Sequence, residues 1–189
     1  MWRISYSSGK IVLYIYKELG KMKGYLANGL FSESDRAYNE LIARRVRDVV
    51  EGIELYVPQE NAALNDKSGY ADSVTIFKGD NDYLDKSDLL IAVIDGVEID
   101  SGVAAEIGRF ALLRQMDIVM FGESKREILA LYTDVRLGGA SNTTKVSALI
   151  EDSTENQFMY RNLYVLGAVK EHGRVFNSLS DLINYLGDR

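Results

Sequence analysis

The chain of 189 residues contains no cysteine and a single histidine, His172. The missing cysteines exclude disulfide bonds, thiol nucleophiles and cysteine-bound zinc. A serine or cysteine nucleophile activated by histidine would have to use that one imidazole. Any catalysis must therefore be carried by carboxylates, hydroxyls, amides or amines.

Positive charge and long apolar runs are also scarce. The chain has 28 acidic and 22 basic residues, and its formal charge of -6 repels a polyanion. Residues 89–94 form an apolar run far shorter than the roughly 18 residues that a membrane span needs. The N-terminal run, residues 11–16, is brief and lacks the small-residue cleavage site of an export signal. We therefore expect a cytoplasmic protein with no membrane or nucleic-acid partner.

Proline is nearly absent, with Pro58 alone, and no repeat or linker divides the chain. Its length suits one full hydrophobic core but is short for two. The exception is the start of the chain, because a second methionine, Met22, directly precedes the first expected core strand. We predict one domain over residues 22–189, with residues 1–21 as an N-terminal extension that is either an addition or a misassigned start.

The apolar pattern predicts strands that alternate with helices. Residues 89–94 are continuously apolar, which is typical of a strand buried on both faces of a parallel sheet. Two segments compete for the next strand, 117–121 and 128–132, and we favour the second. The other expected strands are residues 24–27, residues 53–57 and a short edge strand at 174–176. The expected helices are residues 32–51, 70–86 and 102–114, approximately, together with part of an amphipathic segment at 155–171 and a last helix that begins at Ser178 or Ser180.

This alternation predicts the α/β class: a single-domain, open, mostly parallel sheet flanked by helices, of the flavodoxin-like or Rossmann-like kind. In such sheets ligands bind at the carboxyl ends of the strands. The loops after residues 27, 57 and 94 are thus the places where chemistry is expected. A Gly-rich loop at 137–141 lies further along the chain.

The densest group of functional side chains runs from residue 95 to residue 108, out of the most buried strand and into a helix. Asp100 can cap that helix, and Glu106 lies among small and apolar residues that would let a substrate approach. An apolar setting raises a carboxyl pKa, and a second acid nearby would complete a two-carboxylate glycosyl transfer. The alternative is that Asp100 is only a helix cap and Glu106 a solvated helix residue.

Two further segments carry candidate residues. The turn containing Asn28 and Gly29 follows a strand, but it lacks both dinucleotide-binding and P-loop spacing, so it is either a ligand-contacting turn or an ordinary connection. Asp80 and Asp82 have a spacing that resembles a calcium loop without its required glycine and distal glutamate, so we reject calcium. Either acid could protonate a leaving group, or both could lie on a solvated helix face.

Together these segments resemble the nucleoside 2-deoxyribosyltransferases. The resemblance covers most of residues 22–187, and its most specific part is the pattern Asp-x-Gly-x3-Glu-hydrophobic-Gly at residues 100–108. The other matching segments are residues 25–32, 56–58 and 80–82. Where some members of the family carry a base-reading glutamine, this chain has Ala62, which leaves the base preference open.

The resemblance implies double displacement on a 2′-deoxynucleoside, without cofactor or metal. The glutamate that matches Glu106 would attack the anomeric carbon, and a second nucleobase or water would then release the sugar. By the same matching, Tyr25 would orient the nucleophile and Asp100 would hold the sugar hydroxyls. Asp80, eight residues before Asp88, matches the acid that protonates the departing base, with Asp82 as the alternative.

The resemblance also implies a homo-oligomer, because in this family an asparagine from a neighbouring subunit completes the pocket. Asn162 is the candidate for that role, or else it is an ordinary polar helix residue. Asn28, Gly29 and Asn61 are the other candidates for substrate contacts. The expected partners are a 2′-deoxynucleoside and a free nucleobase, in nucleobase salvage.

Three other functions stay open. Related proteins hydrolyse deoxynucleoside 5′-monophosphates, which would require phosphate ligands near the first turn; Ser32, Ser34 and Arg36 are there, but the two serines are equally explained as helix caps. A nucleoside hydrolase that uses only water would have the same sequence. A module that binds a nucleotide or ribosyl ligand without chemistry would have no need of Glu106.

Overall fold

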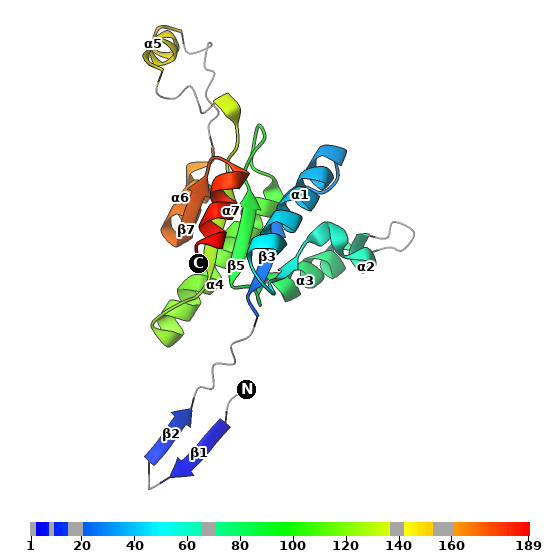
Figure 1. Ribbon diagram of the computed structural model, residues 1–189, viewed down its shortest axis with the longest axis vertical. Coiled ribbons are helices and arrows are strands. Elements are labelled where there is room, and N and C mark those ends of the chain that lie inside the picture. Colours follow the sequence, from blue (N-terminus) through cyan, green and yellow to red (C-terminus); the bar gives the residue numbers. More distant parts are fainter. Residues whose placement is uncertain (1–2, 8–9, 15–20, 66–70, 137–141, 153–160) are drawn as a thin grey trace.

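The computed structural model describes residues 3–7, 10–14, 21–65, 71–136, 142–152 and 161–189. Near the N-terminus, β1 (Arg3–Ser7) and β2 (Lys10–Tyr14) pair antiparallel in a two-stranded sheet of their own (Figure 1). That residues 1–21 form a separate extension stays a prediction. The predicted loop at 137–141 lies outside the described residues.

The main sheet has five parallel strands in the order β4-β3-β5-β6-β7. In chain order these are β3 (Lys23–Ala27), β4 (Glu54–Tyr56), β5 (Leu89–Val93), β6 (Glu127–Leu131) and β7 (Gly173–Phe176). All five residues of β5 are buried, as continuous apolarity requires of a central strand. The order reverses between β3 and β5, which makes the carboxyl ends of these two strands the topological switch point. The predicted open parallel α/β sheet is confirmed.

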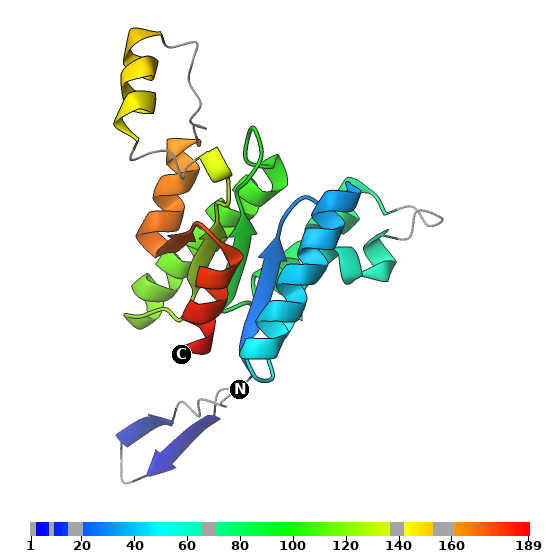
Figure 2. The same cartoon turned by 45° about the horizontal axis from the view of Figure 1, so that its top comes forward.

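Helices cover both faces of this sheet (Figures 1 and 2). The helices α1 (Glu33–Val49) and α7 (Leu179–Gly187) pack on one face over a core that includes Leu26 and Ile91. The helices α3 (Ser73–Leu84), α4 (Ser101–Phe121) and α6 (Leu163–His172) cover the other face over a core that includes Tyr25 and Phe110. The remaining elements are η1 (Pro58–Glu60), α2 (Ala62–Asn65) and α5 (Thr143–Glu151). None of the helices in the described ranges is long and apolar enough to span a membrane.

The main difference from the predicted elements concerns α4. The sequence predicts that this helix ends at about residue 114, but it continues to Phe121. Its C-cap is Gly122, whose φ of 80° is the left-handed conformation common at helix ends. The less favoured candidate strand at 117–121 is therefore helical. The apolar side chains Val119 and Phe121 of this helix are exposed. The segment has the apolar composition of a strand, but it pairs with no strand of the sheet. The favoured strand at 128–132 is confirmed as β6.

The other helix boundaries follow from their caps. The Ser32 hydroxyl accepts a hydrogen bond from the Asp35 N–H at the start of α1, and the Ser178 hydroxyl accepts one from the Asp181 N–H at the start of α7. Of the predicted amphipathic segment at 155–171, residues 163–172 form α6, while residues 155–160 lie outside the described residues.

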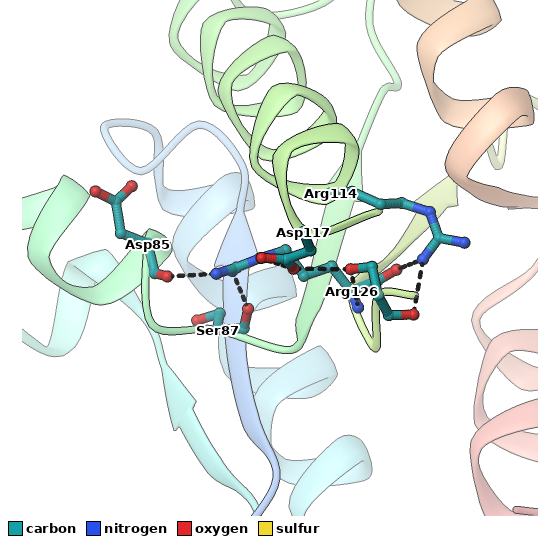
Figure 3. A network of polar contacts seen from close by, with 6 residues as sticks. Asp85, Ser87, Arg114, Asp117 and Arg126 are labelled. Carbon is teal, nitrogen blue, oxygen red and sulfur yellow. Dashed lines mark hydrogen bonds and ion pairs between the residues drawn. The ribbon is translucent and has the colours of Figure 1, made fainter. Parts of the chain in front are cut away.

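An arginine network ties α3 to α4 and to the turn before β6 (Figure 3). The Arg126 guanidinium donates to the carbonyl oxygens of Asp85 and Ser87 at 2.8 and 2.5 Å and to the Asp117 carboxylate at 3.0 Å. Arg114 donates to the Arg126 carbonyl oxygen from above. Each of the three guanidinium nitrogens of the partly buried Arg126 donates to an oxygen, so this side chain holds the C-terminal ends of α3 and α4 together.

Candidate active site

Tyr25 and Glu106 meet across the interface between β3 and α4. The fully buried Tyr25 ring places its hydroxyl 2.5 Å from Glu106 Oε1, to which it donates a hydrogen bond. Glu106 lies in the second turn of α4, which starts at the Asp100 cap: Asp100 Oδ1 accepts from the N–H groups of Gly102 and Val103 at 2.8 and 3.1 Å. A 3.6-residue repeat thus directs Glu106 toward the sheet on the same side as Val103 and Ile107.

The loop that delivers α4 to this position is anchored to the neighbouring strand. Asp95, just after β5, accepts hydrogen bonds from both the N–H and the hydroxyl of Thr133, each at 2.6 Å. Thr133 follows β6, so the carboxylate joins the carboxyl ends of the two central strands. The start of α4, and with it Glu106, is therefore held against a rigid part of the sheet.

The surroundings of Glu106 raise its pKa to about 7. Burial is the largest cause, because it penalises the ionised form; the hydrogen bond from Tyr25 opposes it, and the charges of Asp80 and Asp100 add to the rise. Burial and the same carboxylate raise the pKa of Tyr25 well above its ordinary range, so its phenol remains a donor. Near neutral pH Glu106 is thus present both as a carboxylate and as an acid.

A second tyrosine–carboxyl pair lies beside the first. Tyr56, the last residue of β4, pairs in register with Tyr25, and its hydroxyl donates to Asp80 Oδ1 on α3 at 3.0 Å. Asn61 Nδ2 donates to the same hydroxyl oxygen at 3.0 Å. Burial raises the pKa of Asp80, and the Tyr56 hydrogen bond opposes this rise. Asp82, the alternative acid on the same helix, is exposed.

The turn after β3 belongs to an amide network. Asn28 Nδ2 donates to Asn39 Oδ1 at 2.8 Å, and Asn39 Nδ2 donates to the Gly29 carbonyl oxygen at 3.0 Å and to Gln59 Oε1 at 2.9 Å. The network therefore links the turn at Asn28 and Gly29 to the loop after β4, and both loops lie at the carboxyl ends of their strands.

The sequence of the chain matches a known family. A family model described as nucleoside 2-deoxyribosyltransferase matches residues 25–175, which is most of the chain. The chain belongs to the nucleoside 2-deoxyribosyltransferase family. No curated protein matches its sequence. Membership of this family supports an enzyme that acts on nucleosides and nucleobases.

Solved structures resemble this member of the nucleoside 2-deoxyribosyltransferase family over nearly its full length. A conserved protein from Enterococcus faecalis V583 is 44% identical, covers 90% of this chain and 99% of its own, and superposes with a TM-score of 0.78. A 2-deoxyribosyltransferase from Bacillus psychrosaccharolyticus is 19% identical, and the match covers 86% of this chain and 91% of the other, with a TM-score of 0.55. A 2-deoxyribosyltransferase from Leishmania mexicana is 20% identical, and the match covers 89% of this chain and 98% of the other, with a TM-score of 0.51. The last two similarities show a shared fold.

In this deoxyribosyltransferase-family chain the structure groups Tyr25, Asp80, Asn61 and Glu106, with Asp100 near enough for its charge to act on Glu106. Asn162 is not in that group: it is exposed, and its Oδ1 caps α6 by accepting from the N–H groups of Tyr164 and Val165 at 3.0 and 3.3 Å. Capping accounts for Asn162 within one chain, and its role at a subunit contact stays a prediction. Among the residues that the structure describes, no three histidine, aspartate or glutamate side chains are grouped to hold a metal ion.

Two residues of the site were missed by reasoning from the sequence. In the sequence Tyr56 stands out only as part of a segment that resembles the family, because nothing near it in the chain shows that it faces Asp80. Asn39 lies on α1 in the buried stripe formed with Ile42 and Val46, where a polar residue is unusual. That position could have singled out Asn39, since a buried amide needs partners.

Proposed function

We propose that the protein transfers the 2-deoxyribosyl group of a 2′-deoxynucleoside to another nucleobase, through a covalent ester on Glu106. One observation carries this proposal: a largely buried Glu106 carboxyl group accepts a hydrogen bond from Tyr25 at 2.5 Å, with a second carboxyl group, Asp80, close enough to influence its pKa. Among the described residues no lysine or arginine pairs with Glu106. A carboxylate without a cation retains the electron density that a nucleophile needs.

In the first half of the reaction, a Glu106 carboxylate oxygen forms a bond to C1′ of the sugar while the bond from C1′ to the base nitrogen breaks. The bonding electron pair leaves with the base, which takes a proton from the Asp80 carboxyl group. The raised pKa of both groups supports this assignment, because two neighbouring carboxyl groups that disfavour a double negative charge can share one proton. Tyr25 fixes the attacking carboxylate in one orientation.

In the second half, a nitrogen of the incoming base attacks C1′ and breaks its bond to Glu106. The electron pair returns to the glutamate, and the proton of the incoming base passes to Asp80. Two displacements at one carbon retain its configuration. Asp100 would bind a sugar hydroxyl, since both of its backbone hydrogen bonds use Oδ1 and leave Oδ2 available. Asn28 and Gly29 would line the sugar side of the site.

The proposal is tested by incubating the protein with 2′-deoxyinosine, with and without excess adenine, and following bases and nucleosides by chromatography. Formation of 2′-deoxyadenosine only when adenine is added is the expected result. Release of hypoxanthine without transfer would contradict a transferase and indicate a hydrolase. No change with any deoxynucleoside or its 5′-monophosphate would contradict an enzyme and favour a binding module.

A further inference from the structure

Tyr56 is held on three sides in the site. Its ring stacks on Tyr83 of α3, with centroids 3.8 Å apart and planes within 8° of parallel, and lies 5.3 Å from the Tyr25 ring on the adjacent strand. Asn61, in the loop after η1, donates to its hydroxyl oxygen. A phenol fixed in this way has little freedom to turn away from its partner.

The direction of the hydrogen bonds follows from the donors present. The Asn61 amide is a donor at Nδ2, so it occupies a lone pair of the Tyr56 oxygen and leaves the single phenolic hydrogen for Asp80 Oδ1. Burial raises the pKa of Tyr56, which keeps that hydrogen on the phenol. The Asp80 carboxyl therefore receives one fixed donor at Oδ1, and Oδ2 is left for a ligand.

We infer that Tyr56, oriented by Asn61, is a positioning residue that directs the Asp80 carboxyl group toward the departing base and stabilises the carboxylate that forms as the proton leaves. The inference rests on the proposed function and adds a component to it. It assigns each of the two carboxyls its own tyrosine, Tyr25 for Glu106 and Tyr56 for Asp80, from adjacent strands in register.

The chemistry of the donor sets the expected effect. A hydrogen bond to a charged oxygen is stronger than one to a neutral oxygen, so Tyr56 favours the ionised form of Asp80 and assists loss of its proton. The titratable groups that face Asp80 are Tyr56 from β4, Tyr25 from β3 and Glu106 from α4. Tyr56→Phe keeps the stacked ring and removes only the donor, which should raise the pKa of Asp80.

The test compares two substrates that differ in their need for an acid. Hypoxanthine leaves 2′-deoxyinosine more easily when it is protonated, whereas the cationic base of N7-methyl-2′-deoxyguanosine leaves as a neutral molecule without a proton. We expect Tyr56→Phe to lower kcat/KM for 2′-deoxyinosine about tenfold and to change that for the methylated substrate less than about twofold. The alkaline limb of the 2′-deoxyinosine pH profile should move to higher pH.

Two further variants complete the experiment. Asn61→Ala should act in the same direction with a smaller loss, and it provides the test if Tyr56→Phe does not fold. Tyr185→Phe is the matched control, because Tyr185 donates to the Glu127 carboxylate at 2.8 Å outside the site, and both substrates should react as in the wild type.

Equal losses for both substrates, with the alkaline limb unmoved, would overturn the role of Tyr56 and leave the proposed function standing. Absence of base release by the wild-type protein from either substrate would overturn the proposed function itself, and this inference with it.

Discussion

The helices α3 and α4 carry acidic side chains in two contrasting settings. Asp80 and Glu106 face tyrosines of the sheet, whereas Asp85 and Asp117 face arginines. Arg109 binds Asp85 through two hydrogen bonds of 2.7 Å and lowers its pKa, while burial raises the pKa of Glu106 to about 7. The arginine-facing carboxylates join elements of the fold, whereas burial raises the pKa of both tyrosine-facing carboxyl groups, Asp80 and Glu106.

The largest expected effect follows from removing the charge of Glu106. Glu106→Gln keeps the shape of the side chain and an acceptor for Tyr25 but cannot form the ester. Base release and base exchange should fall at least about 10³-fold, the scale on which loss of a nucleophile acts. Asp117, which faces an arginine, provides the control: the folded Asp117→Asn variant should exchange bases within about twofold of the wild-type rate. Equal losses of activity in the two variants would contradict a functional difference between the tyrosine-facing and the arginine-facing carboxyl groups.

Removing the central arginine should affect stability instead. Arg126→Ala leaves Asp117 and the carbonyl oxygens of Asp85 and Ser87 without their donor, at an expected cost of about 2–4 kcal/mol in the free energy of unfolding. Urea denaturation measures this cost. Arg44→Ala, at an exposed position on α1, should change stability by less than about 0.5 kcal/mol. A similar small change for Arg126→Ala would show that the network does not hold the helices.

Because its pKa is raised, an ionised Glu106 in the candidate active site should lower the stability of the folded protein above neutral pH. The folded protein holds this proton up to about pH 7 and the unfolded chain only to about 4.5, so stability from this group is complete below pH 4.5 and is lost as pH rises to 7. At pH 8, Glu106→Gln should therefore be more stable than the wild type by roughly 1–3 kcal/mol. The difference should shrink in urea titrations below pH 4.5. If Glu106→Gln is less stable than the wild type at pH 8, burial of an ionised Glu106 does not destabilise the fold and the raised pKa is contradicted.

A smaller change is expected from Tyr25→Phe. The Tyr25 hydrogen bond lowers the pKa of Glu106, so its loss should raise that pKa and move the acidic limb of the pH–rate profile to higher pH. At pH 6 the rate should fall about tenfold, and at pH 8.5 the loss should be smaller. A uniform loss at every pH would contradict a role of the Tyr25 hydroxyl in setting the pKa of Glu106.

The sequence predicted the sheet well because its signals are local. The continuous apolar run at residues 89–94 indicates a buried strand without reference to any other segment. The resemblance at residues 100–108 identifies Glu106 and Asp100 as candidate site residues. The pairing of Tyr56 with Asp80 depends instead on two elements 24 residues apart that meet only in the folded chain. The extension of α4 was missed for a related reason: its exposed apolar end has the composition of a strand, and only the position of β6 shows that the sheet has no place for it.

The ester on Glu106 can be looked for directly. The wild-type protein and Glu106→Gln would be mixed with 2′-deoxyinosine in the absence of an acceptor base, quenched in acid, and measured by intact-protein and peptide mass spectrometry. The account predicts the added mass of one deoxyribosyl group on the wild type, mapped to Glu106, and none on the variant. Base exchange without such an adduct, or an adduct on another residue, would contradict it.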